Sequence, residues 1–277
     1  PPQLAQLALQ HSVPLAELQA AAAQARLRQE VLDTISRPWE AKPWHSYRPL
    51  FVTPERIRDG VGFWQRHAAT LARAEQHYRV PASLIVAIIG IETFYGRQMG
   101  RHSVLDSLYT LGFHYPAREE FFAKEFAQLV LLAREEKWPL TSLKGSYAGA
   151  MGMGQFMPSS YLDYAVDGNG DGRRDLFTSY DDVFSSIANY FVKKGGWVRG
   201  GQVAVPATLA AGREEFNPTE WMPTWSLADL AQRGYQPSAP VQPGATATPI
   251  TLEGSTGKQY WLGFQNYYAI TRYNLSK

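Results

Sequence analysis

Hydrophobic residues recur at helical spacing along the first two thirds of the chain, and this spacing is lost beyond Trp197. Apolar positions three to four residues apart are typical of helices that bury one face. We therefore expect helices at about 12–36, 53–71, 81–92, 117–137, 158–164 and 181–194. A Pro- and Trp-rich connection, 37–49, separates the first two. The pattern predicts a mainly α chain with a different texture in its final segment.

Start signals define two of these helices more closely. Ser12 can cap the first helix, with Pro14 in its first turn, because a serine hydroxyl accepts from the free N–H groups of a helix start. In the second helix five apolar residues lie on one face: Ile57, Val61, Trp64, Ala68 and Leu71. That face is expected to be the buried one.

Beyond Trp197 short apolar segments alternate with Gly, Pro, Asn and Thr, which is typical of short strands. They predict a small β-containing lobe over 197–262, with a brief helix at 226–233. The strand-like pieces contain Val203, Val205, Trp221, Ile250, Leu252, Tyr260 and Leu262. The aromatic-rich stretch 263–274 is expected to fold back onto the helical core.

Composition and charge narrow the function classes. Hydrophobic residues make up 45% of the 277 residues and charged residues 19%, which is a globular composition. The net charge of +2 comes from interspersed basic and acidic residues, so no nucleic-acid partner is indicated. Because cysteine is absent, disulfides, thiolate metal sites and a cysteine nucleophile are excluded. Aromatic residues, at 13%, suit a cleft that stacks against sugar rings.

The start of the chain and its apolar runs bear on location. The chain opens on Pro1-Pro2-Gln3 without a charged segment followed by an apolar one. Any signal peptide or lipid anchor is therefore expected to have been removed or never to have been present. The longest apolar run is about half of a membrane span, so no transmembrane helix is expected.

Glu92 follows the apolar run 84–91 and is the only ionisable group there. The run is apolar on every side, which predicts a core helix. A carboxyl group at the end of such a helix is costly to ionise, so its pKa rises toward neutrality and it can act as a general acid. The alternative is a buried glutamate held by an arginine or by backbone donors, and this stretch alone leaves both open.

The segment 145–157 is rich in glycine, with Gly149, Gly152 and Gly154 between apolar residues. Such a pattern indicates a loop in which the backbone closely approaches another group. Pro158 then restarts a helix.

Four segments together resemble the B-type lytic murein transglycosylases of Gram-negative bacteria. They are IIGIETFYG at 88–96, GSYAGAMGMGQFMPSSY at 145–161, IANYF at 187–191 and GFQNYYAITRYN at 263–274. The resemblance runs from about Val80 to the C-terminus, and the helical N-terminal part is compatible with it. The long second segment is the most specific of the four.

This resemblance implies an α+β, mainly α fold, with a lysozyme-like helical core between an α-helical lobe and a small β lobe. The expected boundaries are 1–78 for the α lobe, 79–196 for the core (part of 103–140 joining the α lobe), 197–262 for the β lobe and 263–277 for a return to the core. It also implies cleavage of the MurNAc–GlcNAc β-1,4 bond of peptidoglycan without water, which leaves a 1,6-anhydromuramyl end.

The family further implies a periplasmic location, with outer-membrane association of the full-length form. Peptidoglycan glycan strands are the expected partner, together with proteins of cell-wall synthesis or division. No organic cofactor is expected.

The resemblance also assigns residues. Glu92 falls on the single catalytic acid. The cleft-loop positions are Ser146, Met151, Gln155 and Phe156, and the aromatic lining positions are Tyr190, Tyr267 and Tyr273. Taken without the family, Ser146 could serve only to stabilise a turn, and Met151, Phe156 and Tyr190 could serve only as core residues.

Most glycosidases need two carboxylates. No mate for Glu92 is evident, because Asp106, Glu119 and Glu120 lie in polar surroundings typical of solvated faces or caps. A lone acid suits a mechanism in which Glu92 protonates the glycosidic oxygen and then takes the proton of the attacking C6 hydroxyl. The alternatives are a goose-type lysozyme-like hydrolase and a non-catalytic peptidoglycan-binding scaffold.

A second motif at 167–178 matches the start of an EF-hand loop. Its ligand positions are Asp167, Asn169, Asp171, the Arg173 carbonyl and Asp175, with Gly172 at the sharp turn. Thr178 stands at position twelve in place of a glutamate, so Asp181 or Asp182 is expected to substitute. The family has a calcium loop here, so we expect a structural Ca²⁺, with a monovalent ion or a metal-free Asx turn as alternatives. A single loop argues against a calcium sensor.

Overall fold

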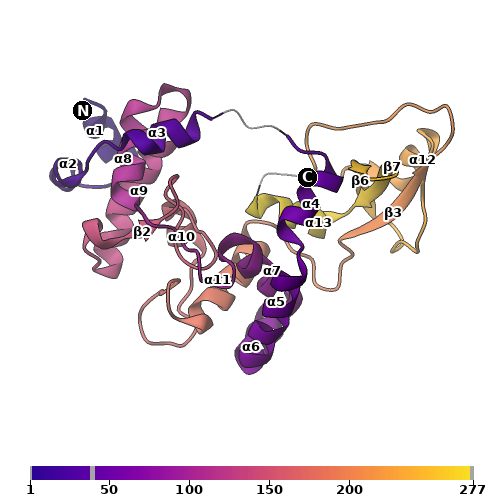
Figure 1. The fold of residues 1–277 in the computed structure, drawn as a ribbon, viewed down its shortest axis with the longest axis horizontal. Helices are drawn as coiled ribbons and strands as arrows, with labels where there is room; N and C mark the ends of the chain where they lie inside the picture. Colours follow the sequence, from indigo (N-terminus) through magenta and orange to yellow (C-terminus); the bar gives the residue numbers. More distant parts are fainter. Residues whose placement is uncertain (1, 38–40, 275–277) are drawn as a thin grey trace. The chain divides into compact units, whose positions relative to one another are not determined.

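Helices dominate the chain, and an antiparallel sheet lies toward its C-terminal end in the orange and yellow part of the ribbon (Figure 1). The computed structural model describes residues 2–37 and 41–274. Its α-helices are α1 (Gln3–His11), α2 (Leu15–Gln24), α3 (Gln29–Ile35), α4 (Trp44–Phe51), α5 (Pro54–Arg66), α6 (Ala68–Tyr78), α7 (Ala82–Thr93), α8 (Val104–His114), α9 (Glu119–Glu136), α10 (Pro158–Tyr164), α11 (Tyr180–Lys193), α12 (Leu227–Gln232) and α13 (Gln265–Tyr273). The prediction of a mainly α fold with a small β lobe is confirmed.

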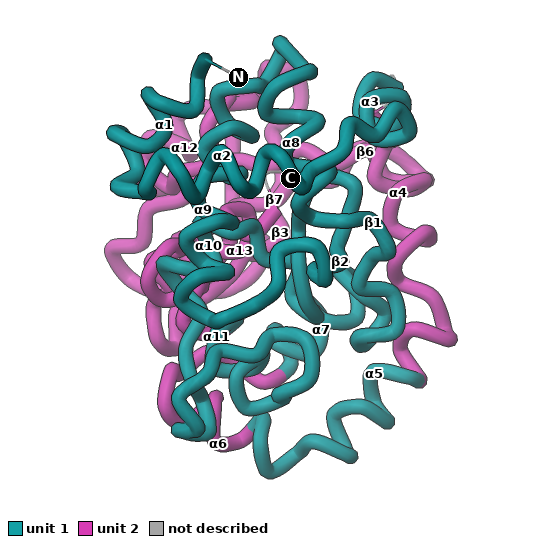
Figure 2. Tube along the Cα trace, turned by 90° about the vertical axis from the view of Figure 1, so that its left-hand side faces the viewer, with its two compact units in different colours: residues 1–39, 59–71, 83–187 teal, residues 40–58, 72–82, 188–277 magenta. Residues whose placement is uncertain are grey.

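The chain divides into two compact units, coloured separately in Figure 2. Unit 1 comprises 1–39, 59–71 and 83–187, and unit 2 comprises 40–58, 72–82 and 188–277. The boundaries fall inside α5, α6 and α11 and after the first residue of α7, so these helices contribute residues to both units. The lobe boundaries expected from the sequence stay a prediction.

In unit 1 the long helix α9 is the centre of a helical layer, with α1, α2, α8 and α10 packed against it. Phe122, Phe126, Leu129 and Ala133 are buried along one side of α9 because they recur at intervals of three and four residues. Two short strands, β1 (His102–Ser103) and β2 (Lys144–Gly145), pair antiparallel next to α8. This pair fixes the start of the glycine-rich loop 145–157.

Unit 2 contains a five-stranded antiparallel sheet with the order β4-β6-β7-β3-β5. The strands are β3 (Ala204–Leu209), β4 (Trp225–Ser226), β5 (Tyr235–Pro237), β6 (Thr246–Gly254) and β7 (Gly257–Gly263). Val205, Leu230, Tyr235 and Leu262 belong to the core cluster of this unit. The two edge strands, β4 with two residues and β5 with three, are much shorter than the central β6 with nine.

The helix predicted at 12–36 is wrong as a single element, because the structure has two helices there, α2 and α3, while α1 ends at His11, before the predicted start. Ser12 does not start a helix but ends α1, in the left-handed conformation with φ 53°. The break between α2 and α3 has a tertiary cause. The backbone N–H of Arg26 donates to Asp106 at 2.9 Å and that of Arg28 to Thr110 at 2.9 Å, so these groups bind α8 instead of continuing a helix.

The buried face predicted for the second helix is wrong in α5 and correct only at Leu71. The pattern over 53–71 forms two helices, α5 and α6. Of the residues expected inside, Leu71 of α6 is buried, whereas the others are exposed: Ile57, Val61, Trp64 and Ala68. The buried side of α5 carries Gly60 and Phe63 instead. The Phe63 ring lies 5.3 Å from that of Tyr95 and 5.9 Å from that of Phe184, so aromatic packing within unit 1 sets the rotation of the helix.

Four helices were not expected. α1 lies before the first predicted helix. α4 begins inside the predicted connection 37–49, of which residues 38–40 are outside the described part, and extends to Phe51. α8 lies between two predicted helices, and α13 occupies the aromatic-rich stretch 263–274. The brief helix expected at 226–233 is confirmed as α12, where the Ser226 hydroxyl accepts from the Asp229 N–H at 3.0 Å. Of the expected strand residues, Val203 and Trp221 lie outside strands.

Candidate active site

Glu92 lies in the last turn of α7 and is partly buried. The helix buries Ile85, Ile88 and Ile89, as its apolar sequence predicts. It is not enclosed on every side, however, because Ser83, Ala87 and Ile91 form an exposed stripe at intervals of four residues. Glu92 therefore sits at the border between the buried face and the exposed stripe, where a side chain is desolvated yet reachable.

Burial raises the pKa of Glu92 from its ordinary 4.5 to about 7. Within the described part of unit 1, no hydrogen bond or ion pair to its carboxyl group is found. The alternative of a glutamate clamped by an arginine in this unit is therefore not realised. A carboxylic acid with this pKa is half protonated near neutral pH and can donate or accept a proton.

The chain leaves α7 through an unusual turn. Phe94 and Tyr95 both have left-handed backbone angles, with φ 49° and 61°, followed by Gly96 at 87°. Two consecutive non-glycine residues in this region carry strain that the surrounding structure must hold in place. Tyr95 provides such a hold, because its ring end packs against Gly60 of α5 and Gly90 of α7; a Cβ at Gly90 would lie only 2.6 Å from its hydroxyl oxygen.

The segment after α7 is bonded to the glycine-rich loop at several points. The Thr93 hydroxyl donates to the Met153 carbonyl at 2.8 Å, and the Gln155 side chain donates from Nε2 to the Met99 carbonyl at 3.2 Å. Gly100 lies so close to the Gly145 backbone that a Cβ there would overlap it. The structure thus brings the Glu92-bearing helix end and the loop 145–157 together within unit 1.

The loop itself is a tight hairpin closed by Met151 and Phe156, whose N–H and carbonyl groups pair in both directions at 2.9 Å. Both side chains are buried, so they pack in the core as their apolar character alone would predict. The Met153 N–H donates to the Leu176 carbonyl at 2.9 Å and ties the hairpin to the chain beyond α10. Contacts of Met151 and Phe156 with a substrate stay a prediction.

The two polar residues that the resemblance assigns to the cleft loop, Ser146 and Gln155, are both partly buried. The Ser146 hydroxyl accepts from the N–H groups of Ala148 at 3.2 Å and Ala150 at 3.0 Å, which stabilises the turn. Gln155 has φ 56°, and its Nε2 donates to Gly152 at 2.9 Å as well as to Met99. The Gln155 amide is thereby oriented with its Oε1 as the remaining polar atom.

The three tyrosines belong to unit 2. Tyr190 is buried, donates from its hydroxyl to the Arg272 carbonyl at 2.8 Å and lies with its ring 4.9 Å from that of Tyr273. The Tyr267 hydroxyl is buried without a partner among the described residues, and burial raises its pKa to about 12. The structure therefore joins Tyr190 and Tyr273 in one aromatic cluster, while a role in lining the active site stays a prediction for all three.

One buried acid was missed from the sequence. Glu125 on α9 is 2% exposed, and its two oxygens accept from the Ser159 N–H at 2.9 Å and the Ser159 hydroxyl at 2.5 Å. Burial raises its pKa. A signal was present, because Glu125 lies three residues after Phe122 and beside Phe126 on the inward side of α9. Its carboxyl group is engaged by α10, so it is not a second catalytic acid for Glu92.

The other acids considered as a second catalytic carboxylate beside Glu92 fall into two groups, one buried and one exposed. Asp106 is buried, contrary to the expectation of polar surroundings, and is paired with Arg28 at 2.7 Å. This ion pair joins the segment before α3 to α8. The spacing of apolar residues along the chain cannot indicate such a long-range contact. Glu119 and Glu120 are exposed in the first turn of α9, as expected.

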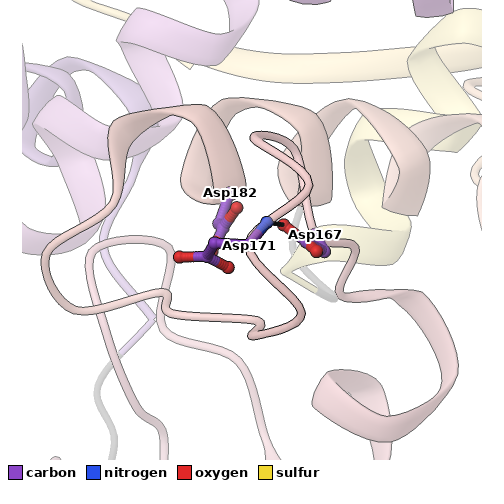
Figure 3. A group of neighbouring side chains, drawn as sticks. All are labelled: Asp167, Asp171 and Asp182. Atoms are coloured by element: carbon purple, nitrogen blue, oxygen red, sulfur yellow. Dashed lines mark hydrogen bonds between the residues drawn. The ribbon is translucent and has the colours of Figure 1, made fainter.

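The acidic loop brings three carboxylates together. Ligand atoms of Asp167, Asp171 and Asp182 lie within 4.8 Å of one another. Figure 3 shows Asp182 on the first turn of α11 beside the loop that carries Asp167 and Asp171. A group of carboxylate oxygens at this separation is the donor chemistry that a hard divalent cation requires. Asp182, which lies beyond Thr178, is the acid that joins this group, and its role as a metal ligand in place of position twelve stays a prediction.

Backbone donors hold these acids in place. Asp182 is fully buried and accepts from the N–H groups of Gly168 at 2.7 Å and Asp175 at 2.8 Å. The Asp175 carboxylate itself accepts from the N–H groups of Phe177 and Thr178. Asp175 therefore caps the turn before α11, and its role as a ligand, like that of Asn169 and the Arg173 carbonyl, stays a prediction.

With this geometry in view, comparison with known proteins decides the family. A family model described as the transglycosylase SLT domain matches residues 2–277. The chain belongs to this family. Within it, the chain is one of the B-type lytic transglycosylases, as the sequence segments predicted.

One curated relative is the membrane-bound lytic murein transglycosylase B of Escherichia coli (strain K12), which is 47% identical over 233 residues. The match covers 84% of this chain and 63% of that protein, so the chain spans less than two thirds of the relative's length. Among residues 2–37 and 41–274, no helix combines the length and apolar character needed to cross a bilayer.

Solved structures of this family share the fold. The catenated lytic transglycosylase SltB1 of Pseudomonas aeruginosa is 44% identical with a TM-score of 0.91, covering 99% of this chain and 90% of its own. The E. coli lytic transglycosylase SLT35, solved in complex with calcium, gives 42% and 0.86, covering 99% and 86%. SltB3 of P. aeruginosa, solved with NAG-anhNAM-pentapeptide, gives 31% and 0.82, covering 99% and 73%.

Proposed function

We propose that this family member is a lytic transglycosylase that cleaves the MurNAc–GlcNAc β-1,4 bond of peptidoglycan and leaves a 1,6-anhydromuramyl end. The observation that carries the proposal is Glu92, a partly buried acid whose pKa of about 7 lets it serve as acid and then as base. The related SltB3, solved with an anhydro-sugar peptide, supports the product class.

In the proposed first step, the Glu92 carboxylic acid donates its proton to the glycosidic oxygen. The bond from C1 to that oxygen breaks, the GlcNAc end leaves as an alcohol, and the N-acetyl group of MurNAc stabilises the oxocarbenium-like C1. In the second step the Glu92 carboxylate removes the proton of the C6 hydroxyl while that oxygen bonds to C1. Glu92 is reprotonated by the C6 hydroxyl proton, while its original proton has left on the GlcNAc hydroxyl, and no water is consumed.

The loop 145–157 is the proposed binding surface for the sugar beside this bond. Gln155 can accept a hydrogen bond through Oε1, because both hydrogens of its amide group are already committed to backbone carbonyls. Ser146 can donate its hydroxyl proton, because its oxygen accepts from two N–H groups. Met151 and Phe156 are buried and support this surface by packing in the core behind it.

The tyrosines of unit 2 are proposed to contact the glycan chain further along. Tyr190, Tyr267 and Tyr273 offer flat rings on which sugars stack and hydroxyl groups that bond to them. Their mutual packing in unit 2, with Tyr190 against Tyr273, supports a preformed aromatic surface. The lobe division expected from the sequence is part of the same proposal.

The loop 167–182 is proposed to hold a Ca²⁺ ion. Asp167, Asp171 and Asp182 would supply carboxylate oxygens, with Asn169 and the Arg173 carbonyl as further ligands. The related SLT35 was solved with calcium, which supports this metal. The ion would link the loop to α11 and neutralise the three acids, a structural effect that leaves the proton transfers to Glu92.

We place this activity in the periplasm, where peptidoglycan lies in Gram-negative bacteria. Association with a membrane is proposed for a longer form only, since the E. coli relative is named membrane-bound and is longer than this chain. Proteins of cell-wall synthesis or division are the proposed partners.

The decisive experiment is digestion of purified sacculi, followed by mass spectrometry of the released muropeptides. The wild type is expected to release anhydro products, lighter by one water than the products of a hydrolase. Glu92→Gln should abolish their release, while the exposed matched control Glu120→Gln retains it. Anhydro products from Glu92→Gln at the wild-type rate would remove Glu92 from the mechanism, and hydrated products from the wild type would indicate a lysozyme-like hydrolase.

A further inference from the structure

We infer that Thr93 is a positioning residue, whose hydroxyl locks the end of the Glu92-bearing helix to the hairpin that carries Gln155. This inference rests on the proposed function, since it concerns how that site is held. Thr93 directly follows Glu92 and is 1% exposed, so its hydroxyl cannot contact a substrate itself. Its effect on the reaction must pass through the groups that it joins.

The Thr93 hydroxyl is the meeting point of three backbone segments. It donates to the Met153 carbonyl at 2.8 Å and accepts from the Gly96 N–H at 3.0 Å. The Ile89 carbonyl, one helical turn back, lies at 3.2 Å. One hydroxyl thus bonds to the left-handed turn after α7 and to the hairpin 60 residues later in the sequence, and it lies close to a carbonyl of α7 itself.

The choice of acceptor distinguishes this arrangement from an ordinary helix-end threonine. A threonine in a helix commonly donates its hydroxyl to the carbonyl four residues back, which concerns only its own helix. Here the distance to Met153 is shorter than that to Ile89, and a hydroxyl has a single proton to donate. The bond to the hairpin is therefore the one that the geometry favours.

The hairpin needs such a tie because its own shape is strained. Gln155 is held with φ 56°, and Gly152 with φ 77° lies against the Leu176 carbonyl, where a Cβ would be only 2.6 Å away. Its tip, Met153, is fixed from both sides: its N–H donates to Leu176 and its carbonyl accepts from Thr93. Loss of the Thr93 hydroxyl removes one side of this clamp and leaves a buried carbonyl without its partner.

The consequence is a fixed relation between the acid and the sugar-binding surface. Glu92 is one residue before the clamp on α7, and Gln155 is two residues after it on the hairpin. Displacement of reacting groups by about 1 Å costs on the order of 10²-fold in rate. Thr93 therefore affects the chemical step through position, without touching the sugar.

The test compares two substitutions at Thr93 with a matched one elsewhere. Thr93→Val keeps the shape and removes the hydroxyl, and Thr93→Ser keeps the hydroxyl. The control is Thr110→Val: Thr110 is 0% exposed, and its hydroxyl accepts from the Arg28 N–H at 2.9 Å on α8. For each protein we would measure kcat and KM on soluble glycan strands, the melting temperature, and hydrogen exchange of the amides of 152–156.

We expect Thr93→Val to lower kcat by roughly 10- to 100-fold and to speed hydrogen exchange at the Met153 and Gln155 amides. The kcat of Thr93→Ser should remain within about threefold of the wild-type value. Thr110→Val should have a lower melting temperature than the wild type but an unchanged kcat. Equal kcat in Thr93→Val and Thr110→Val at comparable melting temperatures would overturn the inference. If Thr93→Val does not fold, Thr93→Ala carries the same comparison.

The outcome separates this inference from the proposed function. A wild type that releases no anhydro product would defeat the function but leave the hydrogen-exchange comparison intact. Exchange at 152–156 that is unchanged in Thr93→Val would defeat the clamp, whatever product the wild type makes.

Discussion

A carboxylic acid that keeps its proton near neutral pH weakens the fold that contains it. Burial of Glu92 disfavours its charged form, which is why its pKa rises to about 7. The sequence predicted this residue and this direction, because an acid at the end of an apolar helix is a local feature. For Ser146 the sequence offered a turn-stabilising role as one alternative, but it could not indicate which N–H groups the hydroxyl meets, since that depends on the backbone path of the loop.

The same pKa predicts how Glu92→Gln changes stability with pH. In the wild type the unfolded chain releases the Glu92 proton near pH 4.5, whereas the folded chain keeps it until about pH 7. The wild type therefore loses stability relative to Glu92→Gln as the pH rises through this window. Since one pKa unit corresponds to about 1.4 kcal/mol and the pKa rises from 4.5 to about 7, the variant should gain at most about 3.5 kcal/mol by pH 8.

Urea denaturation at pH 4, 6 and 8 measures this gain, and the raised pKa of Glu125 cancels because both proteins contain it. Glu120→Gln, on an exposed position, should run parallel to the wild type. A constant difference between Glu92→Gln and the wild type across the whole range would show that the pKa of Glu92 is not raised.

At the scale of elements, the helices whose faces are set by neighbours in sequence were predictable, and their breaks were not. α9, α10, α11 and α12 follow from periodicity and caps. The division of 12–36 into two helices, α2 and α3, follows from bonds between the chain at 26–28 and α8, about 80 residues away. The contact of Glu125 with Ser159 spans 34 residues, so sequence pattern could indicate that Glu125 points inward but not what it meets.

That contact predicts a graded stability series at Glu125. Glu125→Leu removes the acceptor of the Ser159 N–H in the first turn of α10 and should lower the free energy of unfolding by about 2–3 kcal/mol. Glu125→Gln should lower it by less than about 1 kcal/mol, because an amide can accept from the N–H and donate to the hydroxyl. Denaturant unfolding at pH 6 measures both, and a leucine variant as stable as the wild type would contradict the assigned contact.

At the scale of the whole molecule, the acidic loop is expected to make the stability of the protein depend on the concentration of divalent cations in the solution. Asp167, Asp171 and Asp182 repel one another without a cation, and an ion that binds only the folded chain stabilises it by mass action. The sequence predicted the loop at 167–178, while the participation of Asp182 depended on where α11 begins relative to it.

Calcium should therefore raise the melting temperature, and a chelator should reverse the effect. At a free Ca²⁺ concentration of 100 times Kd the gain is about 2.7 kcal/mol. Asp182→Asn should abolish most of this response, whereas Asp163→Asn, at an exposed position outside the three-carboxylate group, should keep it. A melting midpoint that calcium and chelator leave unchanged would rule out the metal site.

The sheet of unit 2 ends on both sides in very short strands, β4 and β5, and β5 finishes in Pro237, which has no N–H to offer. An added strand from another molecule needs a continuous row of free backbone groups, and these borders provide little of one. The lobe is thus protected against edge-to-edge self-association, which matters for a protein whose proposed polymeric substrate would gather many copies on one surface.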